Sequence, residues 1–170
     1  MAIDKRQKKP KSRKPQNEVV GPFVNMAVFC QRPIEDKSGL VSAIKVFDQI
    51  EILRPPGFKQ GDILGIKTWF LVIVKPGDGP KEQKLRLVLH NPSGATQAVA
   101  EADLIMLGGE AGSTLRDQLE LPFDREGLYW LAVEIDGKTL TRVPLRVVLR
   151  SPPEPADHAQ TGATNQVSSA

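Results

Sequence analysis

The chain has 170 residues, a length typical of one domain, and 40% of them are hydrophobic, which is enough to fill a core. Its formal net charge of +3 is unevenly spread, because seven of its cations precede residue 15. The rest of the chain is therefore slightly acidic, which argues against a globular surface that binds nucleic acid. With one cysteine, Cys30, no intrachain disulfide can form, and a reducing compartment is expected.

Both ends of the chain are predicted to be disordered. Residues 1–22 alternate Lys, Arg, Gln and Pro with almost nothing to bury, and residues 151–170 are rich in Pro and small polar residues. No apolar run approaches the roughly 18 residues of a membrane span, and no secretory apolar segment follows the charged start. We therefore expect a cytoplasmic protein with one folded domain at 23–150.

Period-two alternation, the mark of a strand with two different faces, dominates the first part of this domain. Val24, Met26, Val28 and Cys30 share one face, which predicts that Cys30 points into the core. A turn and a second run, 40–52, follow. The next segment, 64–74, is apolar on both faces, as expected of a central strand.

The second part of the domain continues the pattern. Segments 84–90, 98–106 and 115–121 read as strands, and two last strands flank Asp136-Gly137, a dipeptide that suits a tight hairpin turn. Pro144 predicts an edge position or a bulge in the last strand, because proline cannot donate to a ladder.

About eight short strands with Gly and Pro turns predict an all-β sandwich of two antiparallel sheets, with a barrel as the alternative. The stretch 121–129 resembles the entry to the penultimate strand of immunoglobulin-like domains, where a tyrosine hydroxyl bonds back to the preceding loop. Tyr129 would form that corner; the alternative is an ordinary core aromatic.

Groups for catalysis or metal binding are scarce. His90 is the one histidine of the predicted domain and lies at an outward strand end, where a solvated role is favoured. Cys30 could act as a nucleophile with His90 as its general base, but a buried, unreactive structural thiol is favoured. Glu101 and Asp103 share a face yet offer too few oxygens for calcium, and the glycines of 108–114 have the wrong spacing for a phosphate loop. We predict no catalytic residue, metal or cofactor.

Two features point to binding. Trp130 and Trp69 fall opposite the inward sets of their strands and would anchor a partner if exposed, although cover by a neighbouring segment is favoured. The basic head would contact phosphates of nucleic acid or an acidic partner, although a solubilising tail is favoured. Its cations are Lys5, Arg6, Lys8, Lys9, Lys11, Arg13 and Lys14.

The stretch Phe23 to Ile52 resembles the opening of a bacterial family of uncharacterised, domain-of-unknown-function proteins. The matching residues are Cys30, Gly39, Leu40, Ile44, Val46, Phe47 and Asp48. Gln31 stands where the family has an aspartate, and Lys45 where it has a glycine. The closing segment 123–129 and the turn at 136–137 are also similar. The resemblance implies an immunoglobulin-like sandwich, a bacterial origin and no known activity.

The leading hypothesis is a non-enzymatic module that binds an unknown protein through a sheet face or edge. The alternative is a nucleic-acid-associated accessory protein tethered by its basic head. An enzyme is the weakest of the three, because it would need a site assembled from residues distant in sequence.

Overall fold

The computed structural model describes residues 21–59, 61–77, 81–106 and 112–152, and these residues form nine strands. The strands are β1 (Phe23–Glu35), β2 (Val41–Phe47), β3 (Gln49–Leu53), β4 (Leu64–Lys75), β5 (Glu82–His90), β6 (Thr96–Ile105), β7 (Ser113–Phe123), β8 (Gly127–Ile135) and β9 (Lys138–Arg150). The predicted tails lie mostly outside the described residues, as does most of the glycine-rich loop at 108–114.

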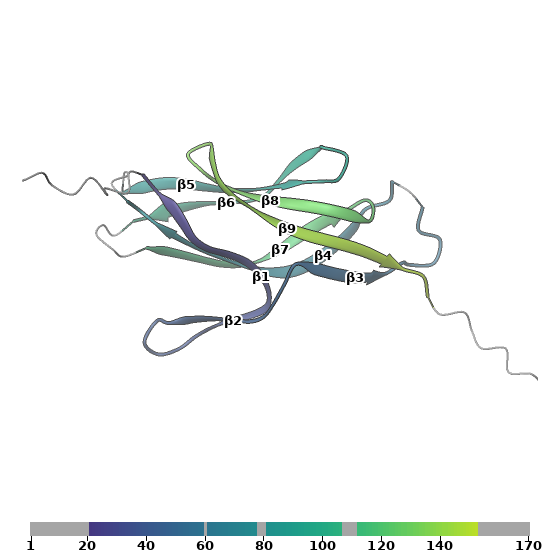
Figure 1. Cartoon of the computed structure of the whole chain (residues 1–170), viewed down its shortest axis with the longest axis horizontal. Helices are drawn as coiled ribbons and strands as arrows, with labels where there is room; N and C mark the ends of the chain where they lie inside the picture. Colours follow the sequence, from purple (N-terminus) through teal and green to yellow (C-terminus); the bar gives the residue numbers. More distant parts are fainter. Residues whose placement is uncertain (1–20, 60, 78–80, 107–111, 153–170) are drawn as a thin grey trace, which may run out of the picture.

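The strands form two packed sheets, which confirms the predicted all-β sandwich (Figure 1). The four-strand sheet has the order β2-β1-β4-β7, and the five-strand sheet has the order β3-β9-β8-β5-β6. One pairing departs from the predicted antiparallel sheets, because β3 runs parallel to β9. The single run predicted at 40–52 also divides at Asp48. There the chain leaves one sheet for the other, and the Asp48 carbonyl accepts a hydrogen bond of 2.7 Å from the Arg146 amide.

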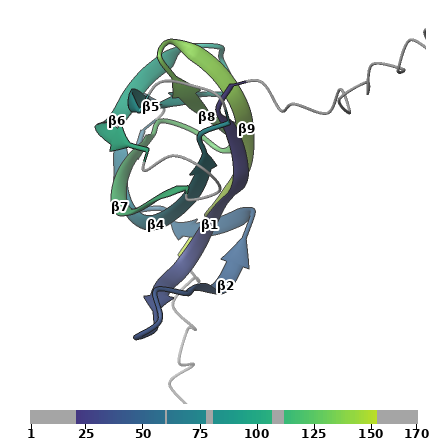
Figure 2. The ribbon, with the colours of Figure 1, turned by 90° about the vertical axis from the view of Figure 1, so that its left-hand side faces the viewer.

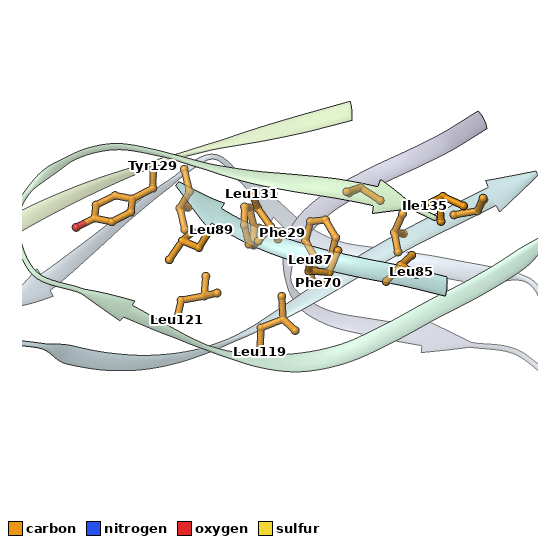
Figure 3. Close-up of a cluster of buried hydrophobic side chains, with 14 of the residues drawn as sticks. Phe29, Phe70, Leu85, Leu87, Leu89, Leu119, Leu121, Tyr129, Leu131 and Ile135 are labelled. Atoms are coloured by element: carbon orange, nitrogen blue, oxygen red, sulfur yellow. The ribbon is translucent and has the colours of Figure 1, made fainter. Parts of the chain in front are cut away.

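The core fills the space between the sheets and follows the predicted alternation. The five-strand sheet contributes completely buried leucines, among them Leu85 and Leu87 of β5 and Leu131 of β8. The four-strand sheet packs Phe70 of β4 and Leu121 of β7 against them (Figure 3). As predicted for 64–74, β4 is a central strand, with β1 and β7 as its neighbours.

Cys30 is buried, as predicted, but it faces away from the main core. The register of β1 against β4 shifts between Val24 and Met26, so the alternation of the sequence does not persist along the strand. As a result, Phe29 enters the core and lies 5.1 Å from Phe70, centroid to centroid. Cys30 pairs with Trp69 on the opposite, outer face of the four-strand sheet.

Tyr129 forms the predicted corner. Its hydroxyl lies 2.8 Å from Asp124 Oδ1 and 3.0 Å from the Arg125 carbonyl, and it accepts from the Asp124 and Arg125 amides at 3.3 Å. The ring is fully buried and packs edge-on against Phe123 at 4.9 Å. The corner fixes the turn between the two sheets, since β7 and β8 belong to different sheets.

The predicted hairpin between β8 and β9 is also present, with φ angles of 49° at Asp136 and 78° at Gly137. Pro144 sits at a local edge, as predicted. The Arg146 amide points to the Asp48 carbonyl on the β3 side, so the proline nitrogen two residues earlier faces the same side, before the β3 pairing begins.

Candidate functional site

A hairpin formed by β1 and β2 projects from the sandwich (Figures 1 and 2). The pairing of β1 with β4 ends at Cys30, and the rest of β1 pairs with β2 alone. The Asp36 carboxylate closes the turn by accepting from the Ser38 hydroxyl at 2.6 Å and from the Ser38 and Leu40 amides at 2.8 and 3.0 Å. The Ser38 hydroxyl and these amides lower the pKa of Asp36. The tip of the hairpin is therefore a turn ordered by side-chain hydrogen bonds.

An ion pair ties the end of β1 to a strand that β1 does not pair with. Glu35 contacts Arg116 of β7, although β4 separates β1 from β7 in the sheet. Arg116 lies opposite Leu71, which is completely buried although it does not belong to the main core. The Glu35 end of β1 therefore reaches across the outer side of β4.

The hairpin concentrates exposed apolar side chains. Four of the nine large hydrophobic residues exposed among the described residues lie on it, with exposed fractions of 40 to 70%. They are Ile34, Leu40, Ile44 and Val46. β2 is also an edge strand, so one side of its backbone has no neighbouring strand in the described part of the chain. Free backbone groups beside apolar side chains are what an added strand requires.

Trp130 lies on the outer face of the five-strand sheet, as predicted, and is 38% exposed. Its cross-strand neighbours are His90 of β5 and Pro144 of β9. His90 is half-buried, and its Nε2 atom is enclosed without a hydrogen-bond partner among the described residues. The expectation of a freely solvated histidine was therefore wrong, because the outer face of the sheet is partly covered around it.

Trp69 lies on the outer face of the other sheet and is half-buried. The two tryptophans predicted as anchors thus occupy opposite sides of the sandwich and cannot form one site. The same geometry separates Cys30 from His90, the one histidine among the described residues, so His90 cannot act as a base for the thiol. Burial raises the pKa of Cys30 and keeps the thiol protonated.

The acidic pair of β6 consists of Glu101 and Asp103. Glu101 pairs with Arg86 of β5 at 3.1 Å. Across the described residues, no group of three His, Cys, Asp or Glu side chains could hold a metal ion. Within the same residues, no helix is long and apolar enough to span a membrane. The predicted contacts of the basic head lie outside the described residues.

Sequence reasoning missed the hairpin as a site. The sequence of residues 34–46 predicted a strand, a turn and a second strand, and nothing local marked β2 as a free edge. The exposed apolar positions became visible only once the partners of each strand were known.

A model of the family of unknown function DUF6941 matches residues 25–148, so the chain belongs to this family. No curated protein matches the chain. Among solved structures, the chain is similar to the Pseudomonas fluorescens alkylpurine DNA glycosylase AlkC bound to DNA containing an abasic site analog, with 13% sequence identity and a TM-score of 0.38. The match covers 59% of this chain and 28% of that chain, and a likeness this weak carries no functional argument.

Proposed function

We propose that this member of the DUF6941 family is a non-enzymatic binding module that takes up an extended segment of another protein along the free edge of β2. The observation that carries the proposal is the concentration of exposed apolar side chains on the projecting hairpin. An added strand gains main-chain hydrogen bonds from the edge, and alternate apolar side chains give it specificity.

Short length or charge discourages strand addition at the other edges of the two sheets, whereas the one charged residue of β2 is Lys45. On β3, which has only five residues, Glu51 pairs with Arg150 at 2.9 Å. On β6, Glu101 pairs with Arg86, and β7 places the exposed charge of Asp117 opposite Phe70. Short length and charge discourage strand addition. The β2 edge is the one that combines a free backbone with several exposed apolar side chains.

The proposal also includes an immunoglobulin-like topology, a bacterial origin and a cytoplasmic location, each with its own support. An immunoglobulin-like topology is supported by the Tyr129 corner at the entry to the penultimate strand, with β1, β4 and β7 in one sheet and β5, β8 and β9 in the other. The resemblance of the opening strands supports a bacterial origin. The single buried thiol supports a reducing, cytoplasmic location.

The test compares the full chain with the double variant Ile34→Lys/Ile44→Lys. Proteins captured by each are quantified, and a synthetic peptide from the partner is then titrated by calorimetry. We expect the double variant to lose binding at least about tenfold, because two exposed apolar contacts are replaced by charges. The binding mode is read separately, from slower amide hydrogen exchange in β2 when the peptide is present.

The matched control is Leu53→Lys/Ile105→Lys, which adds the same charge at two residues that are 66 and 68% exposed on the β3 and β6 edges. The control should bind like the unmodified chain. Equal binding by all three proteins, or protection of amides outside β2, contradicts the proposal. A dimer in sedimentation that the Ile34→Lys/Ile44→Lys variant abolishes would make a second copy the occupant and refute a heterologous partner.

The second candidate function rests on the seven cations before residue 15. If they tether nucleic acid, removal of residues 1–20 abolishes binding to DNA and RNA, and the affinity of the full chain falls steeply with salt. Binding that survives the deletion, or no binding by the full chain at low salt, refutes the tether. The β2 proposal is unaffected by either result.

A further inference from the structure

The four-strand sheet splits open beside Cys30. β1 and β4 are paired as far as Cys30 and Trp69, after which β1 continues with β2 while β4 continues with β7. The split leaves a cleft with a volume of about 570 Å³. This volume is within the range of small-molecule sites, which is roughly 300 to 1,000 Å³.

The side chains around the cleft combine an apolar surface with a positive charge. Phe47, Ile50 and Trp69 supply apolar surface, and Lys45 and Lys67 supply the charge. No carboxylate is among the residues that line the cleft. Within the described part of the chain, neither lysine forms an ion pair.

A carboxylate on the same face of the sheet is held away from Lys67. Glu120 lies directly across from Lys67 in the register of β4 and β7. Its side chain leans over Gly65 instead, where a Cβ atom would come within 2.8 Å of its Oε1 atom. Because Gly65 has no side chain, the Glu120 carboxylate can lie over it. The Lys67 ammonium is therefore available to an anion.

Lys45 lines the cleft although its backbone conformation is unfavourable for a residue with a side chain. Its φ angle of 49° lies in the left-handed region, which only glycine adopts without strain. The ladder between β1 and β2 is interrupted there, between the pairs Cys30–Val46 and Arg32–Ile44. A strained residue in an interrupted ladder places its cation on the cleft wall.

We propose that this cleft binds a small organic anion that carries a planar ring, with Lys45 and Lys67 facing the anionic group and Trp69 contacting the ring. Amide side chains of Gln31 and Gln118 border the same cleft and supply hydrogen-bond donors. The cleft shares Lys45 and Val46 with β2, but the anion proposed for it does not depend on the partner proposed for the β2 edge.

The probe is 8-anilinonaphthalene-1-sulfonate, a planar aromatic anion, titrated into the full chain at low salt. N-phenyl-1-naphthylamine, which has the same rings without the sulfonate, measures the apolar contribution. The indole N–H signals of Trp69 and Trp130 in a ¹⁵N spectrum, assigned with Trp130→Phe, locate the probe. We expect the Trp69 signal to move and the Trp130 signal to stay.

Two variants test the charges. Lys67→Gln should weaken sulfonate binding about fivefold, and Lys45→Gly should do the same while relieving the strained backbone, so that its stability does not fall. Lys84→Gln, an exposed lysine on the other sheet, is the control and should leave binding unchanged. Binding of the neutral amine should not respond to any of the three.

The proposal is overturned if the sulfonate moves the Trp130 signal alone, or if Lys67→Gln and Lys45→Gly bind it as tightly as Lys84→Gln does. It is also overturned if Ile34→Lys/Ile44→Lys, which leaves the cleft intact, abolishes sulfonate binding. That last result would place the probe on the hairpin, and loss of peptide binding with retained sulfonate binding would separate the two proposals.

Discussion

Replacing Tyr129 with phenylalanine removes a single oxygen from the centre of the corner between β7 and β8. The ring stays buried against Phe123, so the apolar contribution of the side chain is retained. What is lost is the 2.8 Å hydrogen bond to the Asp124 carboxylate, with the Arg125 carbonyl close by, and an acceptor for two backbone amides.

A hydrogen bond to a charged group contributes roughly 1.5 to 3 kcal/mol, and the two amide contacts at 3.3 Å are long and weak. Asp124 keeps its contacts with Arg125 at 2.9 and 3.0 Å, so the carboxylate does not become an isolated charge. We therefore expect Tyr129→Phe to lower the free energy of unfolding by about 2 kcal/mol.

Urea unfolding followed by fluorescence measures this change, and the slope of the transition should be unchanged. A second measurement uses alkaline pH. Burial and the Asp124 carboxylate raise the pKa of Tyr129 to about 12, so its contribution is complete below pH 10 and is lost as the pH rises toward 12. That loss should be absent in Tyr129→Phe. A change in free energy below about 0.5 kcal/mol would refute the structural role of the hydroxyl.

Three further predictions concern single groups. Burial opposes ionisation of Asp124, but hydrogen bonds from Tyr129 and Arg125 outweigh burial and lower the pKa of this carboxyl. The ionised Asp124 therefore contributes to the free energy of unfolding in full above about pH 4, and this contribution should be lost as the pH falls through the lowered pKa. Urea titrations from pH 2 to 7 should show this loss in the unmodified chain and not in Asp124→Asn. Gly127→Ala should lower the free energy of unfolding by about 2 kcal/mol in the same assay, because φ is 141° and the new Cβ would lie 2.7 Å from Pro92. The control Gly94→Ala, where φ is 87° and the space around the new Cβ is open, should lower it less. Equal losses in the two variants would contradict this reasoning. Cys30 is completely buried, so Ellman's reagent should label it only after urea unfolding; rapid labelling of the native chain would contradict its burial.

Much of the sandwich was predictable because each signal is local. The alternation around Leu85 and Leu131 reports directly which side of a strand is buried. Asp136-Gly137 requires a backbone conformation that only a tight turn offers, and Tyr129 sits where its hydroxyl returns to the residues just before it. Each inference needed no more than a dozen consecutive residues.

The features that were missed depend on residues far apart in the chain. A register shift between Val24 and Met26 is set by pairing with β4, more than 40 residues away, and it reverses which face Cys30 occupies. The parallel pairing of β3 with β9 joins segments about 100 residues apart, as in Ile50 with Val147. Trp130 was placed on the correct face, but its partial exposure depends on β5 and β9.

Lys45 lies both on the β2 edge and on the wall of the cleft. With φ at 49°, a glycine would be unstrained there, whereas lysine brings strain together with a cation. The same residue lies within the edge strand β2, so partner addition along β2 and anion binding in the cleft meet at one point. Lys45→Gly removes the charge and leaves Ile34 and Ile44 in place. Anion binding should therefore fall while peptide binding along β2 persists, and a joint loss of both would mean that the hairpin and the cleft form a single site.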